Sequence, residues 1–173
     1  CHVIINALFL SHAKREDVKV HLIFYGPPAP PKHIIIHPEK YLPETGSGVG
    51  SIDFSKKDIA NFIRKMLYKY RKDQKTEVFR GCFVEKRNLF QVIEDLKGEG
   101  KTIFILDGDG VDIRKIQDKK LENSVFLLGY HKGLPAKEFK RLKQTCDLVS
   151  VGNKTYFASQ VVTIVNNEID RRN

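Results

Sequence analysis

A dense group of polar side chains at residues 11–17 contains residue types that a group-transfer reaction needs. Arg15 can hold a phosphate or a carbonyl through paired N–H donors, and Asp17 can accept a proton or orient a base edge. The same two residues could equally form an ion pair at the end of a helix, an arrangement that stabilises little. The spacing makes Arg15 and Asp17 candidate catalytic residues and leaves both interpretations open.

A second candidate site comes from three apolar runs at residues 102–106, 124–128 and 147–151. Runs of this kind, separated by helical patterns, are typical of an α/β fold with a mainly parallel sheet and helices on both faces. Ligands of such sheets bind where the strands end, and glycine lets a ligand approach the backbone. We therefore expect a small-molecule site there, unless each glycine serves only its own turn. The segments that would line it are Leu106-Asp107-Gly108, Leu128-Gly129 and Val149-Ser150-Val151-Gly152.

The remaining patterns place the elements that hold these residues. Alternating apolar positions predict a strand over 18–24, and a second short strand is predicted over 33–37. An apolar stripe predicts a helix over 59–70, with Ser55 and Asp58 as its capping box. Helices are also predicted over 89–96, from Pro135, and over 157–169, and the segment 107–110 is expected to turn the chain. The glycine-rich segment 46–51 lacks the context of a phosphate-binding loop and is interpreted as a loop.

The chain is basic, with 30 Lys and Arg against 21 Asp and Glu, which gives a formal net charge of +9. A surplus of this size favours a polyanionic partner, and nucleic acid is the first candidate. Arg64 and Lys65, on the helix over 59–70, are the candidate RNA-binding residues, although a solvated helix face explains them as well.

Other chemistries find little support in the sequence. The three cysteines are widely and irregularly spaced, so we expect free thiols and no zinc site. The histidines form no metal-binding motif, and His33 and His37, which flank a strand, are predicted to lie on the surface. No apolar run approaches the ~20 residues of a membrane span. With 173 residues, of which 41% are hydrophobic, we expect one domain over 1–173, without metal or membrane contact.

Several motifs, taken in order, resemble the archaeal TrmY family of tRNA pseudouridine N1-methyltransferases. The resemblance covers nearly the whole chain, and the order and spacing of its motifs are more specific than any one of them. The motifs are Phe9-Leu10-Ser11-His12-x-x-Arg15-x-Asp17, Tyr25-Gly26-Pro27-Pro28-Ala29-Pro30-Pro31, Gly98-x-Gly100-Lys101, Phe126-Leu127-Leu128-Gly129-x-His131-x-Gly133, Ser150-Val151, and Ala158 with Thr163-Ile164.

The resemblance implies a SPOUT-class fold whose C-terminal part is threaded into a deep trefoil knot. It also implies a cytoplasmic homodimer that transfers a methyl group from S-adenosyl-L-methionine to N1 of a pseudouridine in the T-loop of tRNA. Asp17 would then help to remove the N1 proton or orient the base, and Arg15 would hold the phosphate or the carbonyl of the target nucleotide. The cofactor-binding residues implied are Leu106, Gly108, Leu128, Gly129, Val149, Ser150, Val151, Tyr156 and Val161.

Two departures from the family limit what can be carried over. The family has a segment with glycine and arginine upstream of residue 1 that contributes to substrate binding, so we expect that the natural protein is longer at this end. Some members have a cysteine where Val161 stands, and Cys146 does not match that position. A ribosomal RNA pseudouridine N1-methyltransferase, a non-catalytic RNA-binding module and an ordinary nucleotide-binding α/β enzyme are the alternatives.

Overall fold

A computed structural model describes residues 1–11, 13–37, 55–129 and 133–172. The chain divides into two compact units, Cys1–Val92 and Ile93–Asn173, here called the first and the second unit. The predicted glycine-rich loop at 46–51 and His131 of the family motif lie outside the described residues.

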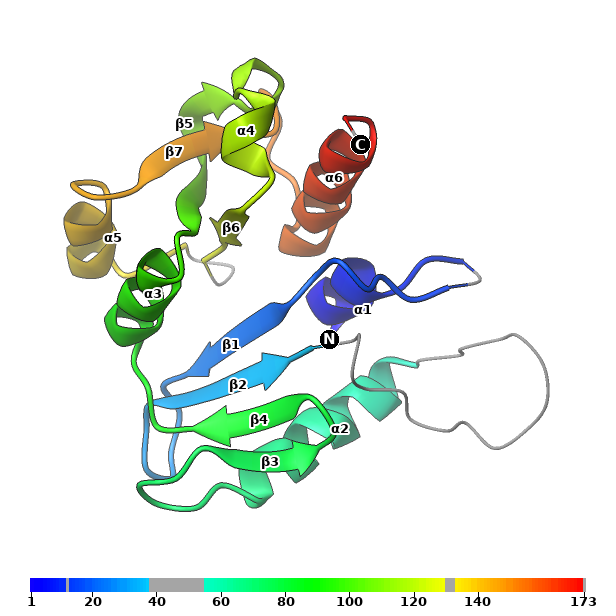
Figure 1. Cartoon of the computed structure of the whole chain (residues 1–173), viewed down its shortest axis with the longest axis vertical. Coiled ribbons are helices and arrows are strands. Elements are labelled where there is room, and N and C mark those ends of the chain that lie inside the picture. The colour runs from blue at the N-terminus through cyan, green and yellow to red at the C-terminus, as the bar shows by residue number, and fades with distance from the viewer. Residues whose placement is uncertain (12, 38–54, 130–132, 173) are drawn as a thin grey trace. The chain divides into compact units, whose positions relative to one another are not determined.

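The first unit is built on an antiparallel sheet (Figure 1). The strand order is β1-β2-β4-β3, and the register pairs Val20 with Ile36 and Ile34 with Val84. The sequence predicted β1 and β2 but missed the two short strands of the β3–β4 hairpin. The prediction of a mainly parallel sheet is therefore wrong for this unit. Its elements are α1 (His2–Leu8), β1 (Val20–Phe24), β2 (Lys32–Ile36), α2 (Lys56–Tyr68), β3 (Thr76–Phe79) and β4 (Cys82–Glu85).

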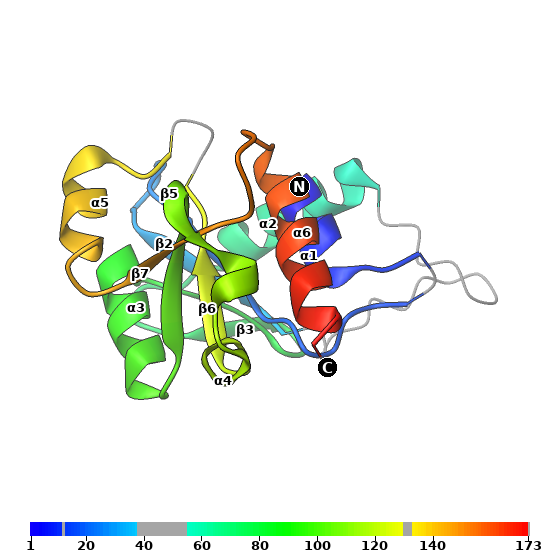
Figure 2. The ribbon, with the colours of Figure 1, turned by 90° about the horizontal axis from the view of Figure 1, so that it is seen from above.

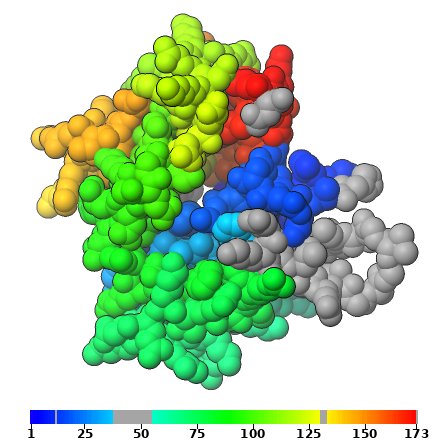
Figure 3. Space-filling model, in the orientation of Figure 1, coloured from blue at the N-terminus to red at the C-terminus, as the bar shows by residue number. Residues whose placement is uncertain are grey.

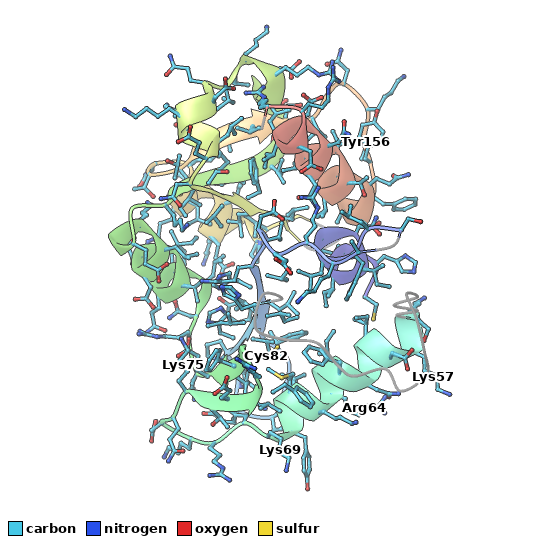
Figure 4. All side chains as sticks on the ribbon, turned by 45° about the vertical axis from the view of Figure 1, so that its right-hand side comes forward. Lys57, Arg64, Lys69, Lys75, Cys82 and Tyr156 are labelled. Carbon is cyan, nitrogen blue, oxygen red and sulfur yellow. The ribbon has the colours of Figure 1, made fainter. Side chains whose placement is uncertain are left out.

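Helix α2 covers one face of this sheet, where it contacts β2 and β4. It begins with the predicted capping box: the Ser55 Oγ accepts from the Asp58 N–H at 3.2 Å, and the Asp58 carboxylate accepts from the Ser55 N–H at 3.2 Å. Ile59 and Met66 are the buried positions of its apolar stripe. Cys82 of β4 belongs to the same buried core, and burial raises the pKa of its thiol to about 12 (Figure 4).

The second unit contains the predicted parallel sheet, with the order β6-β5-β7. Figure 2 shows α4 and α6 on one side of this sheet and α3 and α5 on the other, as predicted. The core on the α6 side consists of Phe104, Ile113, Leu121, Val149 and Val165. The elements are α3 (Leu89–Gly98, which begins in the first unit), β5 (Thr102–Asp112), the 3₁₀ helix η1 (Ile113–Lys115), α4 (Asp118–Leu121), β6 (Ser124–Leu127), α5 (Ala136–Leu142), β7 (Asp147–Ser150) and α6 (Ala158–Asp170).

Strand β5 is longer than predicted, because it continues beyond Leu106. Leu106 and Val111 both pair with Val149 of β7, and Asp112 pairs with Ser150. Residues 107–110 are therefore an excursion between two paired parts of one strand. The prediction that this segment is a turn that ends the strand is wrong.

The three cysteines are free, as predicted. Within the described ranges, no helix is both long and apolar enough to cross a membrane. The same residues contain no group of three or more His, Cys, Asp or Glu side chains arranged to hold a metal ion. Helix α5 lies on the surface of the second unit (orange in Figure 3).

Candidate functional site

The carboxyl ends of the parallel strands bring three predicted cofactor-binding residues into one row. Leu127 of β6 pairs with Ile105 of β5, and Leu128 follows directly in the chain. Leu106, the residue after Ile105, pairs with Val149 of β7. Leu128, Leu106 and Val149 therefore lie side by side at the edge where ligands of parallel sheets bind.

Close backbone packing shapes this edge at Gly110 and Gly129. A Cβ atom on Gly110 would lie 2.5 Å from the Val149 nitrogen and 2.7 Å from the Leu148 carbonyl carbon. A Cβ atom on Gly129 would overlap the Gly133 backbone. Both positions therefore require glycine because a side chain would have no space there, and not because of their φ angles.

Gly108, which the sequence selected, is exposed, and a Cβ atom there would meet nothing within 4 Å. The glycine that packing requires in this excursion is Gly110, which the sequence analysis did not single out as a site residue. Its place in the run Asp107-Gly108-Asp109-Gly110 was visible in the sequence, but its close approach to the backbone of β7 was not.

Apolar side chains of β5 and α6, and of the residue after β7, pack against the core beside this edge. Leu106, Val151 and Val161 are partly buried and pack against the core cluster that contains Val149. The Ser150 hydroxyl closes its own turn, since it donates to the Gly152 carbonyl and accepts from the Gly152 N–H, both at 3.2 Å. Any contact of Ser150 with a ligand would therefore involve its backbone more readily than its hydroxyl group.

Two aromatic residues before α6 are open to solvent. Tyr156, which the sequence selected, is 40% exposed, and Phe157, which it did not, is 79% exposed. Phe157 was interpreted as part of the apolar stripe of the closing helix, whereas the structure makes it the N-cap residue. An exposed phenylalanine beside a partly exposed tyrosine offers flat apolar surface to a ring-shaped ligand.

In the first unit, Arg15 and Asp17 follow a tight turn after α1. The Leu10 N–H donates to the Ala13 carbonyl at 2.7 Å, and the Arg15 N–H donates to the Leu8 carbonyl at 2.8 Å. The Arg15 guanidinium lies 3.2 Å from the Asp17 carboxylate. The exposed fraction of the side chain is 7% for Arg15 and 58% for Asp17, so only Asp17 is openly accessible in this structure.

The predicted RNA-binding residues Arg64 and Lys65 lie on α2 and are both exposed. Figure 4 shows Arg64 on α2 between Lys57, near the start of the helix, and Lys69, at its C-cap. The structure thus places Arg64 and Lys65 on a different element from Arg15, the third residue predicted to contact RNA, and from Asp17.

The first unit contains a buried cluster of polar side chains, His21, His33 and Glu85, that the sequence did not predict. His33 is 3% exposed, so its predicted surface position is wrong. Its Nδ1 lies 3.1 Å from the Glu85 carboxylate, and its Nε2 lies 2.9 Å from Nδ1 of His21. Burial, followed by the neighbouring His33, Lys19 and Lys75, lowers the pKa of His21 to about 3.

The sequence matches a protein family over its whole length. A family model described as "Putative SAM-dependent RNA methyltransferase" matches residues 1–173. The chain belongs to this family. Its resemblance to the TrmY family, predicted from the motifs, is confirmed by relatives that are named tRNA (pseudouridine(54)-N(1))-methyltransferase.

Three of these relatives give the extent of the similarity. The protein of Methanococcoides burtonii is 33% identical over 99% of this chain and 81% of its own length. That of Methanococcus aeolicus is 33% identical over 99% of this chain and 82% of its own length. That of Methanopyrus kandleri is 32% identical over 98% of this chain and 77% of its own length.

A solved structure shares the fold of this methyltransferase. The crystal structure of Archaeoglobus fulgidus Nep1 bound to S-adenosylhomocysteine superposes with a TM-score of 0.55 at 15% identity. The likeness covers 81% of this chain and 57% of that chain, so this chain spans little more than half of Nep1. It supports the predicted SPOUT-type α/β fold.

The residues at the strand ends fit the cofactor that the family description names. The adenine ring of S-adenosylmethionine needs apolar surface on its faces and backbone hydrogen bonds at its edge. Leu106, Leu128 and Val161 offer the former, and the backbone beside Gly129 and Val151 can offer the latter. The close packing at Gly110 keeps β5 and β7 together beside this surface.

Proposed function

We propose that this chain transfers the methyl group of S-adenosyl-L-methionine to N1 of pseudouridine 54 in the T-loop of tRNA. Relatives of this name match 98–99% of the chain at 32–33% identity. The observation that carries the proposal is the row of Leu128, Leu106 and Val149 at the carboxyl edge of the parallel sheet. This row gives a member of the methyltransferase family a surface suited to the cofactor.

The cofactor-binding surface comprises residues 106–108 of β5, the segment that follows β6, the end of β7 with the residue after it, and the region around the start of α6. When bound, S-adenosylmethionine supplies an activated methyl group on a sulfonium. The protein restricts the approach of the reactants, and such positioning can contribute about 7 kcal/mol or more. The residues that we assign to this surface are Leu106, Gly108, Leu128, Gly129, Val149, Ser150, Val151, Tyr156 and Val161.

Asp17 is proposed to accept the proton from N1 of the pseudouridine. Pseudouridine is joined to its ribose through carbon, so N1 still carries a hydrogen. Transfer of the methyl group from a bound S-adenosylmethionine to N1 would displace the N1 proton, and the Asp17 carboxylate would take up that proton. S-adenosylhomocysteine is the second product. The exposed carboxylate of Asp17 supports this role.

Arg15 is proposed to be a positioning residue. Its guanidinium is buried and lies 3.2 Å from the Asp17 carboxylate, so it can hold that carboxylate in one orientation. A contact with the phosphate or the carbonyl of the nucleotide, as the sequence suggested, would require the Arg15 side chain to be uncovered.

The proposal also includes features that rest on the family resemblance. We infer a homodimer in the cytoplasm, a single methyltransferase domain over 1–173, and a C-terminal part threaded as a deep trefoil knot. Light scattering of the purified chain tests the dimer. A crystal structure with S-adenosylhomocysteine tests the knot and the cofactor-binding residues, since it would trace the chain through residues 102–170.

The decisive experiment measures methylation of two T-arm RNAs that differ in one nucleotide. One carries pseudouridine at position 54 and the other carries uridine, whose N1 is occupied by the ribose. We expect N1-methylpseudouridine, identified by mass spectrometry, in the first RNA only. A pseudouridine-containing hairpin from ribosomal RNA forms the third arm, and preferred methylation of that hairpin would overturn the tRNA assignment. Failure to bind S-adenosylhomocysteine in calorimetry would overturn the methyltransferase function and favour a non-catalytic RNA-binding module.

A further inference from the structure

One face of α2 has a composition that the packing of the first unit does not explain. Lys57, Asn61, Arg64 and Tyr68 follow one another at spacings of four, three and four residues, so they form a single stripe. This stripe lies opposite the stripe that contains the buried Ile59 and Met66. It is therefore the face of α2 that points away from the core.

The charges around this stripe are almost all positive. Besides Lys57 and Arg64, the exposed side chains of Lys56, Lys65 and Lys69 lie on α2 or at its C-cap. The helix itself contains one acidic residue, Asp58, whose carboxylate accepts from the backbone and the hydroxyl of Ser55 in the cap. No ion pair joins the five cations to a carboxylate among the residues that the structure describes.

A solvated helix face would account for the lysines, but not for the tyrosine among them. Tyr68 is 85% exposed, more than any other large hydrophobic side chain among the described residues. It lies one turn after Arg64, and Lys69 follows it directly. An aromatic ring held open to solvent between cations is typical of surfaces on which a nucleic-acid base or ribose stacks while its phosphates are neutralised.

We propose that this α2 basic face, defined as Lys57, Arg64, Lys65, Tyr68 and Lys69, is a docking surface for the backbone of a folded RNA. The cations contact successive phosphates, and Tyr68 stacks on an unpaired base or a ribose. The surface supplies affinity without sequence reading, because cations hold phosphates whatever the base. The identity of the RNA as tRNA rests on the proposed function, whereas RNA binding by this face does not.

The packing of α2 favours RNA over an anionic lipid surface as the occupant of this face. An anionic lipid surface attracts lysines equally well, but an amphipathic helix that binds membranes turns its apolar stripe toward the lipid. The apolar stripe of α2 is buried against the sheet of the first unit, and a single tyrosine is left outside. Vesicle binding is therefore the contrary outcome that the experiment must include.

The test measures binding of an unmodified tRNA transcript to the full chain, without cofactor, at salt concentrations between about 50 and 200 mM. In the first variant, Lys57, Arg64 and Lys65 are all changed to alanine. We expect a loss of affinity of about tenfold or more, and a slope of log affinity against log salt that is smaller by about 2–3.

The matched control changes Lys115, Lys137 and Lys140 of the second unit to alanine, which removes the same charge from exposed positions. Two of these lie on the surface helix α5 (Figure 3). We expect a much smaller loss of affinity from this variant. An equal loss from both triple variants would overturn the proposal, because binding would then follow net charge alone.

Tyr68 is tested by a pair of substitutions. Tyr68→Ala is expected to lower the affinity about tenfold with an unchanged salt slope, and Tyr68→Phe, which keeps the ring, is expected to restore it. Wild-type affinity in Tyr68→Ala would overturn the stacking role. Thermal melting of each variant verifies that it folds. We expect no change in melting temperature, because the Tyr68 side chain is almost fully exposed.

Two further measurements separate this proposal from the proposed function. S-adenosylhomocysteine binding is measured by calorimetry in the first triple variant, where we expect the wild-type value. If the parent chain fails to bind that ligand but shows the expected RNA results, the proposed function fails and the docking surface stands. If the chain binds phosphatidylserine vesicles and not tRNA, the docking surface fails, whatever the cofactor does.

Discussion

Gly110 of β5 lies so close to Val149 of β7 that a side chain at position 110 has no space. The nearest backbone atom to its missing Cβ is the Val149 nitrogen, at 2.5 Å. This contact occurs where the excursion at 107–110 ends and the two strands pair again. The shape of the proposed cofactor-binding surface therefore depends on having no side chain at position 110.

Replacing Gly110 by alanine should disturb both the second unit and its ligand. Because the obstructing atoms belong to the backbone of β7, the strands must separate, and overpacking of this kind costs about 1–3 kcal/mol. We expect a lower melting temperature and weaker binding of S-adenosylhomocysteine in calorimetry.

Two glycine variants serve as controls for this prediction. Gly98→Ala, at the end of α3, meets no atom within 4 Å and should change neither property. Gly108→Ala also has free space, so it should fold normally, and any loss of ligand affinity in it would report a direct contact. Normal melting and binding in Gly110→Ala would contradict the close approach.

Asp17→Asn should separate catalysis from binding. Removing the carboxylate but keeping its shape should lower kcat on pseudouridine-containing T-arm RNA about 10²-fold, because the proton of N1 loses its acceptor. S-adenosylhomocysteine affinity should stay unchanged, whereas the melting temperature should fall slightly, because the carboxylate is 58% exposed but pairs with the buried Arg15 guanidinium. Single-turnover kinetics measures the first effect, and unchanged turnover would remove Asp17 from the mechanism.

Arg15 requires a different readout, because its side chain is buried. Arg15→Ala should lower both the activity and the melting temperature. The melting temperature falls because the substitution leaves a cavity where the buried side chain was. Arg15→Lys, which keeps the charge, should recover part of kcat if Arg15 acts by positioning Asp17. It should also leave the pH profile of kcat centred where the wild type has it. A kcat defect in Arg15→Lys that matches Asp17→Asn would instead point to a direct contact with the nucleotide.

Helices and strands with a periodic apolar pattern could be predicted from the sequence. Features that depend on close contacts between distant segments were missed. Leu106, Leu128 and Val149 could be predicted to meet because parallel strands end at one edge. The β3–β4 hairpin was missed, since strands of four residues with mixed polarity leave too short a pattern. The need for glycine at position 110 was also missed, because it depends on a strand almost 40 residues away.

The burial of His33 was likewise beyond the sequence. Its partner Glu85 lies on β4, the strand beside β2, and the register that pairs the two residues could not be predicted because β4 itself was not predicted. His33 was predicted to lie on the surface because it was expected to flank a short apolar strand, whereas it lies within β2.

The lowered pKa of His21 predicts that the chain loses stability in mild acid. With a pKa of about 3 when folded and 6.5 when unfolded, the unfolded chain binds about one proton more between these two values. Stability contributed by the neutral ring is therefore complete above pH 6.5 and declines as the pH falls toward 3. We expect a loss of about 1–2 kcal/mol between pH 7 and pH 5 from this residue.

His21→Gln isolates that contribution in urea unfolding curves at each pH. Glutamine cannot be protonated, so the variant should show a flatter dependence on pH between 7 and 5 than the wild type. Identical pH dependence in the two proteins would mean that His21 titrates normally in the folded state.

Arg172 should stabilise the second unit more than its exposed neighbour Arg171. The Arg172 guanidinium donates to the carbonyls of Ile116 and Ile113 at 2.7 and 3.0 Å, and to the Asp118 carboxylate at 2.8 Å. It thereby ties the end of α6 to η1 and to the start of α4. Arg172→Ala leaves two carbonyls without this donor, and we expect it to lower the free energy of unfolding by about 1–3 kcal/mol.

Arg171→Ala removes the same charge from an exposed position and should change the stability by less than about 0.5 kcal/mol. Most of the Arg172 effect should persist at high salt, because hydrogen bonds to carbonyls are screened less than the ion pair with Asp118. Urea unfolding at low and high salt measures both variants. If the two variants were equally stable, the hydrogen bonds from Arg172 to the two carbonyls would contribute nothing to stability. That result would contradict the prediction.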